Sequence, residues 1–298
     1  MRSWSLGLVV FGSLLVTGCP GGGGGESSPA APTPDAPAAS PTPDAPAPAA
    51  APSDPSPPKT PPAGLSQGKS DGEWVHEKSG IVLVWAPPGT FQMGSEAEKE
   101  QPVHEVRLTR GFWLGKTEVT LGQYRAYCTA AGATPPETEA GDDHPATHVS
   151  WDDAQAFCQW AGLRLPSEAE WEWAARGGDG RSYPWGNEEP GTTRANWKGA
   201  EDGHEKTAPV GSFPAGASPI GALDMGGNVV EWVEDWYADG YPAGAATDPT
   251  GPGSGSFRAF RGGCHTFPAE RCRATDRGGL APARKVGYLG FRVALSAP

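Results

Sequence analysis

The stretch from Asp224 to Tyr237 reads DMGGNVVEWVEDWY, and the rest of the folded chain is organised around it. It combines two apolar pairs, three aromatic residues and four carboxylates behind a double glycine, whose backbone can adopt positive φ or approach a ligand closely. Asp224, Asn228 and Glu231 offer hard oxygen atoms, and calcium binds several such oxygens together with backbone carbonyls. The alternative is a buried, tryptophan-rich strand and turn whose carboxylates face water.

The N-terminus has the features of an export signal. Arg2 precedes an apolar run from Leu6 to Val16, which is too short to span a membrane, and small residues follow it. Residues 1–18 are therefore expected to be a signal peptide, and their end resembles a bacterial lipobox in which Cys19 is lipidated. Acyl chains on Cys19 would attach the protein to membrane lipid in the cell envelope, outside the cytoplasm, with the outer membrane or cell surface favoured. An ordinary signal peptide with an incidental cysteine is the alternative.

Residues 19–72 are expected to form a disordered linker. They are rich in proline, alanine and glycine, with almost no large apolar side chain, so they cannot bury enough surface to offset the entropy of ordering. The remaining residues, 73–298, are long enough for one large domain with its own core. The formal net charge of −12 argues against nucleic acid as a partner, because binding to phosphates requires a basic surface.

Helical signals are confined to the first half of this domain. The sequence predicts three helices, each preceded by a hydroxyl residue that can cap it. Alternating apolar and polar residues predict a β-hairpin over 104–120, and the later part of the chain shows short strands and many turns. The fold class is therefore α+β, loop-rich with little regular structure. The expected helices follow Thr120, Ser150 and Ser167, and the expected strands include 81–84, 257–263 and 287–295.

Several motifs, taken in this order, resemble the formylglycine-generating enzyme (sulfatase-modifying factor) family. The resemblance extends across nearly the whole domain and implies a variant of the C-type lectin fold. It is specific for the family and says little about activity, which depends on the site. The motifs are PPGTFQMGS, GFWLGKTEVT, HVSWDDAQAFCQWAGLRLPSEAEWEWAARGG, YPWG, DMGGNVVEWVEDWY, FRAFRGG and LGFRVAL.

Formylglycine-generating members of that family bind Cu(I) through two cysteines five residues apart, and two thiolates suit this soft ion. Counted from the RGG run that ends at Gly263, the first of these cysteines falls on Phe267 and the second on Cys272. Counted back from Arg277, Cys272 matches neither, so the resemblance implies a broken pair. If catalysis persists at a relocated copper site, Cys264 and Cys272 are the candidate catalytic residues. The alternative is that both are structural cysteines.

Four cysteines follow Cys19, and they allow three pairings. In an exported protein, thiols that approach each other tend to oxidise. The family often joins the second helix to the segment after the RGG run, and by that resemblance we expect a disulfide between Cys158 and Cys272. Cys128 and Cys264 are left without an assigned partner.

The resemblance also implies two structural calcium sites built from hard oxygen ligands on loops. A cation that binds only the folded state would stabilise such a loop-rich domain. Loops held by hydrogen bonds alone are the alternative. The first set of ligands is Asn196, Trp197, Asp202 and His204, and the second set is Asp224, Gly227, Val229 and Glu231.

These observations leave three hypotheses about function. In the first, a lipid-anchored protein has lost copper-dependent oxidation and acts as a binding or scaffold module, with a protein or peptide ligand in a groove near Arg261 to Arg277. In the second, an active oxygenase oxidises a protein cysteine through Cys264, Cys272 or another site. In the third, a lectin-like protein binds carbohydrate or peptidoglycan through aromatic rings beside a calcium ion. The broken cysteine pair favours the first hypothesis over the second.

Overall fold

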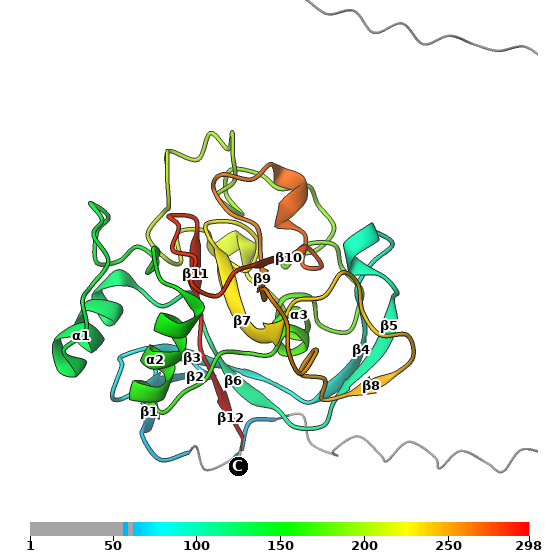
Figure 1. The fold of residues 1–298 in the computed structure, drawn as a ribbon, viewed down its shortest axis with the longest axis horizontal. Helices are drawn as coiled ribbons and strands as arrows, with labels where there is room; N and C mark the ends of the chain where they lie inside the picture. The colour runs from blue at the N-terminus through cyan, green and yellow to red at the C-terminus, as the bar shows by residue number, and fades with distance from the viewer. Residues whose placement is uncertain (1–55, 59–61, 298) are drawn as a thin grey trace, which may run out of the picture. The chain divides into compact units, whose positions relative to one another are not determined.

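The computed structural model describes residues 56–58 and 62–297. The predicted signal peptide, the lipidation site at Cys19 and most of the predicted linker lie outside these residues. Within the described part, short strands in three sheets combine with three α-helices and long loops (Figure 1). No helix in that part is long and apolar enough to span a membrane.

The three sheets are built from segments that lie far apart in the sequence. The five-stranded sheet has the order β1-β2-β3-β6-β12, the four-stranded sheet β10-β9-β7-β11 and the three-stranded sheet β4-β5-β8. Most neighbours are antiparallel, but β11 runs parallel to β7 and β8 parallel to β5. The strands are β1 (Leu65–Gln67), β2 (Glu73–His76), β3 (Val82–Ala86), β4 (Gly89–Met93), β5 (His104–Leu108), β6 (Phe112–Gly115), β7 (Val230–Trp236), β8 (Ala246–Thr247), β9 (Arg258–Arg261), β10 (Arg277–Leu280), β11 (Leu289–Phe291) and β12 (Ala294–Ser296).

The three α-helices form where their capping residues predict them. Each N-cap hydroxyl accepts a hydrogen bond from the backbone N–H three residues later, and the side chain of that later residue accepts one in return. The first two helices end at glycines in the left-handed conformation, Gly132 and Gly162. The helices are α1 (Leu121–Ala131), α2 (Trp151–Ala161) and α3 (Glu168–Arg176), and short 3-10 turns occur at η1 (Glu98–Glu100), η2 (Pro214–Gly216) and η3 (Ala269–Cys272).

The predicted hairpin over 104–120 is wrong. Both strands exist, but β5 pairs with β4 in the three-stranded sheet, whereas β6 pairs with β3 and β12 in the five-stranded sheet. Alternation along one segment reports strand formation and does not identify the partner strand. Here the partners are supplied by segments outside 104–120.

The folded domain begins earlier than residue 73. Leu65–Gln67 forms β1 and pairs antiparallel with β2, so this part of the predicted linker belongs to the five-stranded sheet. Leu65 is 8% exposed and contributes to the core. Leu65 packs into the core, and β2 supplies the strand with which this segment pairs.

The stretch around β7 forms the centre of the domain, as the sequence predicts. Val230, Trp232 and Val233 are fully buried, and Figure 1 shows β7 in the middle of the domain with α3 beside it. The carboxylates of this stretch do not all face water: Asp224 and Glu231 are buried in the interior. The expectation of a tryptophan-rich buried strand is confirmed, and the interior carboxylates require partners.

Candidate functional site

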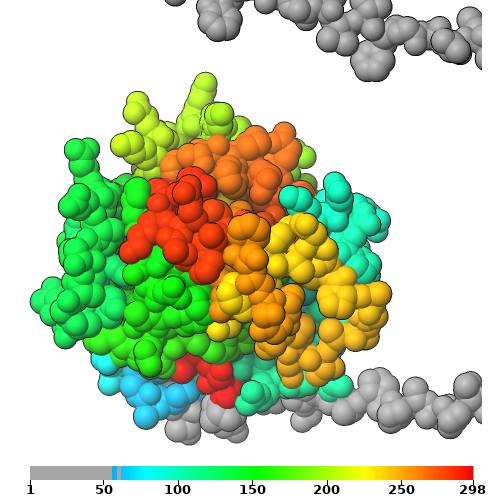
Figure 2. Space-filling model, viewed as in Figure 1, coloured from blue at the N-terminus to red at the C-terminus, as the bar shows by residue number. Residues whose placement is uncertain are grey.

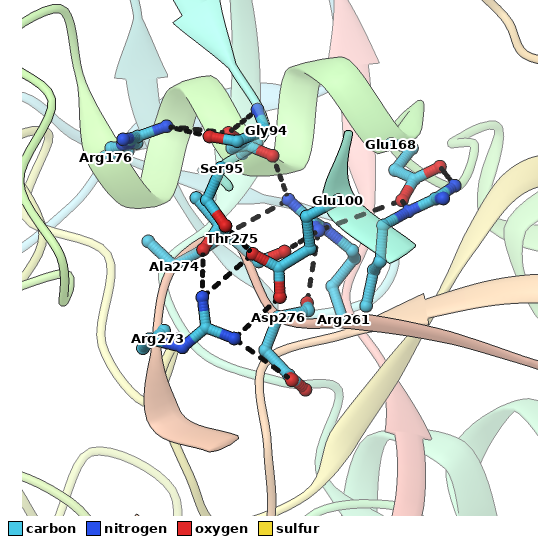
Figure 3. A network of polar contacts seen from close by, with 12 residues as sticks. Gly94, Ser95, Glu100, Glu168, Arg176, Arg261, Arg273, Ala274, Thr275 and Asp276 are labelled. Carbon is cyan, nitrogen blue, oxygen red and sulfur yellow. Dashed lines mark hydrogen bonds and ion pairs between the residues drawn. The ribbon is translucent and has the colours of Figure 1, made fainter. Parts of the chain in front are cut away.

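Arg261 on β9 lies at the centre of a buried network of ion pairs (Figure 3). Its guanidinium is fully buried, forms an ion pair with Glu172 of α3, and donates to the backbone carbonyls of Thr275 at 2.8 Å and Asp276 at 3.1 Å. A further bond reaches the carbonyl of Ala274 at 3.2 Å. Arg261 therefore fixes the backbone of residues 274–276 to α3, and its side chain is not available to a ligand.

Two further ion pairs attach neighbouring segments to the same network. Glu168 at the start of α3 accepts two hydrogen bonds from Arg277, at 2.6 and 2.8 Å. Glu100 of η1 likewise accepts two from Arg273, at 2.8 and 2.7 Å. Arg261 therefore does not line the groove expected near Arg261 to Arg277, because its side chain is fully buried. Arg277 is 5% exposed.

Cys264 and Cys272 lie close to each other in the interior. Both are fully buried, and Gly263 lies so tightly against the backbone of Arg271 and Cys272 that a Cβ there would clash with the Arg271 carbonyl oxygen. The Cys264 Sγ lies 3.1 Å from the Thr266 Oγ1. Burial raises the pKa of both thiols, and the neighbouring Cys264 raises that of Cys272 further. Both are therefore held as neutral thiols, which are poor nucleophiles.

The predicted disulfide between Cys158 and Cys272 is not formed in this structure. All four cysteines of the described residues are free thiols. Cys158 lies on α2 among the apolar side chains that α1 and α2 bury, whereas Cys272 lies in a separate small cluster with Tyr183 and Ala195. Because the two cysteines lie in different clusters, they do not form the disulfide that the resemblance implies.

Phe267 lies four residues after Gly263, at the position where the count from the RGG run places the first copper cysteine. Its ring is half-buried and contacts the ring of Tyr288, with 5.7 Å between the centroids. The guanidinium of Arg271 lies 4.9 Å from the centre of the Phe267 ring. Figure 2 shows the segment that carries Phe267, in orange, beside the segment that carries Tyr288, in red, on one face of the domain.

Two hollows open beside the segment from Cys264 to Gly279. The first has a volume of about 690 Å³ and an aromatic and cationic lining, and its rim carries Phe257, which is 49% exposed. The second has a volume of about 1020 Å³, and its lining includes three histidines, two lysines, three glutamates and Tyr288. The first includes Lys99, Tyr237, Phe257, Phe260, Phe267 and Arg271, and the second includes His144, His148, Lys198, Lys206, His265 and Tyr288.

The first predicted calcium set lies on a loop whose two ends, Asn196 and Lys206, are joined by a hydrogen bond. Asn196 is buried, and its side-chain Nδ2 donates to the carbonyl of Lys206 at 2.7 Å. One oxygen of Asp202 accepts from the backbone N–H of His204 at 2.9 Å, while the other, Oδ2, is buried without a partner. A buried carboxylate oxygen without a donor is what a cation ligand requires, so these residues fit calcium. Trp197, the fourth residue of the set, is half-buried on the same loop.

The second predicted set divides into two parts. Asp224 Oδ1 is buried without a partner, and Gly227 and Val229 follow it in the turn that leads into β7. Both oxygens of Glu231 instead accept hydrogen bonds from Arg292, at 2.6 and 2.7 Å. Glu231 is therefore committed to a buried ion pair.

Glu118 is a buried carboxylate that was not among the predicted site residues. It is 1% exposed, and its Oε2 has no partner. Alternation in the segment TEVT would place Glu118 opposite the apolar Val119 and hence toward solvent, yet both side chains are buried. The reason is that this segment has left the strand β6 and runs through the interior before α1, so the period of two no longer applies. Among the described residues, no group of three or more histidine, cysteine, aspartate or glutamate side chains is placed to hold a metal, so any calcium site here depends on carbonyl oxygens as well.

The fold and these loops define a domain of the formylglycine-generating type. Residues 73–297 match the family model described as sulfatase-modifying factor enzyme 1-like domain, and the chain belongs to this family. It is 38% identical over 279 residues to a formylglycine-generating enzyme from Streptomyces coelicolor, across 71% of this chain and 88% of that protein. These matches confirm the predicted family and its loop-rich α+β fold.

Two further comparisons place the chain among diverse relatives. It is 41% identical over 167 residues to the inactive C-alpha-formylglycine-generating enzyme 2 from Mus musculus, across 51% of this chain and 49% of that protein. The solved structure of PvdO from Pseudomonas aeruginosa is similar with a TM-score of 0.70 and 30% identity, across 77% of this chain and 100% of that chain. The family thus includes a member named as inactive.

Proposed function

We propose that this chain is a lipid-anchored envelope protein whose formylglycine-generating-type domain acts as a binding or scaffold module without copper-dependent oxidation. The observation that carries this proposal is the aromatic ring of Phe267 at the position that the resemblance gives to the first copper cysteine. A phenyl ring offers no ligand to Cu(I), whereas two thiolates hold this ion. Lipid on Cys19 would hold the module at the membrane.

The state of the two nearby thiols supports the same proposal. Cys264 and Cys272 are fully buried, and burial raises the pKa values of both thiols. Cys264 also follows Gly263 directly and does not lie five residues before Cys272. The residues present therefore do not fit the two-cysteine copper site of the family.

The hollow of about 690 Å³ beside Phe267 is the ligand site that we propose for the module. Its lining combines aromatic rings with the partly exposed guanidinium of Arg271, and an exposed ring, that of Phe257, stands at its rim. A few residues, enriched in tryptophan, tyrosine and arginine, contribute most of the binding energy in protein interfaces. A protein or peptide segment is the class of ligand that suits this lining.

Calcium at the first set, Asn196, Trp197, Asp202 and His204, is part of the proposed function. The unpartnered Asp202 Oδ2 supports it, and the ion would supply structural stability to the loop between residues 196 and 206. It has no role in a reaction.

The oxidation assay tests the loss of copper chemistry. The full chain, extracted in detergent from the membrane fraction where the lipid anchor would place it, is loaded with Cu(I) in air and mixed with a peptide that carries Cys-x-Pro-x-Arg. Mass spectrometry measures conversion of the peptide cysteine to formylglycine. We expect no copper retention and no conversion by the wild-type chain.

Two variants of one position make the result interpretable. Phe267→Cys creates two cysteines five residues apart and is expected to retain about one equivalent of Cu(I), whereas Phe267→Ser removes the ring without adding a thiol and is expected to retain none. Conversion by the wild-type chain that Cys272→Ser abolishes would show an active oxygenase and end the proposal.

A further inference from the structure

A third hollow, with a volume of about 590 Å³, is lined by α3, β7 and the loop that follows β7. Alanine, proline and methionine side chains form much of its wall, and a few buried polar side chains complete it. A volume of this size and a mostly apolar wall are typical of a small-molecule site. The apolar lining includes Met93, Ala169, Pro242, Ala243, Ala245, Ala246 and Pro249, and the buried polar side chains are His104, Glu168, Asp235 and Arg277.

Two of these polar side chains satisfy each other. Glu168 accepts hydrogen bonds from Nε and Nη2 of Arg277, at 2.6 and 2.8 Å. The remaining nitrogen, Nη1, donates to the carbonyls of Lys99 and Ala238 at 2.9 and 2.8 Å. All three nitrogens of Arg277 are therefore bonded within the protein, and this side chain does not offer the hollow a free cation for an anionic ligand.

Asp235 has one carboxyl oxygen that is not used inside the protein. It is 4% exposed, and its Oδ2 accepts from the backbone N–H of Glu168, the first residue of α3, at 2.8 Å. Its Oδ1 receives no hydrogen bond from the described residues. Gly251 lies beside this oxygen with φ of +69°, and a Cβ there would come within 2.9 Å of Oδ1, so the glycine keeps the adjacent space open. A buried carboxyl oxygen without a donor is unfavourable, and a ligand can supply the donor.

The charges around Asp235 favour a cationic donor. Burial, followed by repulsion from Glu168, Glu170 and Glu234, raises the pKa of Asp235 to about 8. The Nδ1 of His104 donates to the backbone carbonyl two residues earlier, at 3.0 Å, so the Nε2 of the neutral ring is a second acceptor. The hollow therefore presents acceptors and negative charge. The other titratable side chains that line it are Asp239, Tyr241 and Arg277.

We propose that this hollow binds a primary alkylammonium group, whose nitrogen donates to Oδ1 of Asp235 and whose alkyl chain lies against the apolar wall. The N–H of the ammonium supplies the missing donor in a charge-assisted hydrogen bond, and burial of the chain adds a hydrophobic contribution. This inference goes beyond the proposed function and does not depend on ligand binding beside Phe267. A free amine and a lysine side chain carry the same group, and the experiments below separate these two sources.

Isothermal titration calorimetry of the full chain in detergent at pH 8 tests the proposal with pentan-1-amine. We expect one saturable equivalent for the wild-type chain, with an affinity that increases about fourfold for each methylene added from ethylamine to pentan-1-amine. Pentan-1-ol, which has the same chain and no charge, should bind at least about tenfold more weakly, because it cannot form the ion pair.

Asp235→Asn removes the negative charge and keeps an oxygen that can accept from the Glu168 N–H. We expect this variant to bind pentan-1-amine about 30-fold more weakly or worse, since loss of one partner of a buried charge pair has an effect of this size. The matched control is Asp71→Asn, an exposed aspartate before β2, which should bind as the wild-type chain does. Thermal unfolding of both variants verifies that they are folded.

The pH profile separates pairing with Asp235 from apolar binding alone. Below about pH 8 the ammonium must displace the proton of Asp235, so the affinity of the wild-type chain should rise about tenfold from pH 6 to pH 7. The amine itself stays protonated over this range. The affinity of Asp235→Asn should not change with pH in the same interval.

A peptide with an acetylated N-terminus and a single lysine identifies the source of the ammonium group. Binding of this peptide, but not of its Nε-acetylated form, indicates a lysine of a protein partner, and binding of pentan-1-amine alone indicates a small amine. Both results support the site. The proposal is overturned if neither probe binds, if pentan-1-ol binds as tightly as pentan-1-amine, or if Asp235→Asn keeps the affinity and pH profile of the wild-type chain.

Discussion

Removal of the Arg261 side chain should be among the most destabilising single changes in this domain. In Arg261→Met, the carboxylate of Glu172 loses its fully buried partner, and the carbonyls of residues 274–276 lose their donor. Breaking a buried ion pair by removing one partner costs about 3–5 kcal/mol, because a charge is left uncompensated in the interior. A domain of this size loses about 2–4 °C in melting temperature per kcal/mol, so we expect a decrease of roughly 6–20 °C.

The assay is thermal and urea unfolding of the full chain, followed by tryptophan fluorescence. The matched control is Arg110→Met, an arginine on the surface, which should melt within about 2 °C of the wild-type chain because surface substitutions are nearly neutral. A double variant, Arg261→Met with Glu172→Gln, removes the uncompensated charge and should recover part of the lost stability. The amide oxygen that Glu172→Gln leaves in place can still accept from the Gly94 N–H, as the Glu172 carboxylate does at 2.9 Å.

The coupling between the two changes decides whether the reasoning is correct. If the buried charge is the cause, the double variant is more stable than Arg261→Met alone. Two results would refute this reasoning. One is a melting temperature for Arg261→Met close to that of the wild-type chain. The other is a loss of stability in the double variant that exceeds the sum of the losses in the two single variants. Such a result would mean that Glu172 is compensated by Arg176, which lies 3.1 Å away, and that the carbonyls find other donors.

Two further predictions follow from buried groups. Burial raises the pKa of Asp235 from 3.8 to about 8, so the folded state binds this proton more tightly than the unfolded state and the free energy of unfolding falls as the pH rises from about 4 to 8. In Asp235→Asn, the amide oxygen can still accept from the Glu168 N–H, so this variant should gain stability relative to the wild-type chain across that range. Urea unfolding of both proteins at pH 5 and pH 8 measures this gain. An equal difference in the free energy of unfolding at the two pH values would count against the prediction. Because all four described cysteines are free thiols, alkylation in denaturant without reductant should modify each of them, and protection of Cys158 together with Cys272 would instead demonstrate the disulfide that the resemblance implies.

Local interactions explain which parts of the fold the sequence predicts well. The helices α1, α2 and α3 begin at hydroxyl residues whose capping bonds span three positions, so the information lies within one turn. The pairing of β5 and β6 could not be obtained in this way, because their partners β4 and β3 are chosen by the arrangement of whole sheets. Periodicity reports the presence of a strand and leaves its neighbour undetermined.

The site shows the same division between local and long-range information. The motifs identify the loop at Asn196 and the turn at Asp224, but the choice between a cation ligand and an ion-pair partner depends on residues distant in sequence. Glu231 is satisfied by Arg292, which lies 61 positions later, and Glu118 accepts a hydrogen bond from Asn228, which lies 110 positions later. The spacing of residues along the chain does not predict contacts between residues so far apart in sequence.

The buried network also explains how a domain of this family can keep its fold while its chemistry changes. Arg261 holds residues 274–276 through backbone carbonyls and Glu172, and neither Cys264 nor Phe267 contributes a side chain to these bonds. The ring of Phe267 lies at the surface of this framework against Tyr288, so exchanging a cysteine for phenylalanine there leaves the framework intact. The bonds of the framework and the proposed site therefore involve different side chains. The proposed loss of copper chemistry needs one substitution at the half-buried Phe267 and no change in the buried network. Similarity over the whole domain therefore establishes the family and leaves the activity to be tested at Phe267.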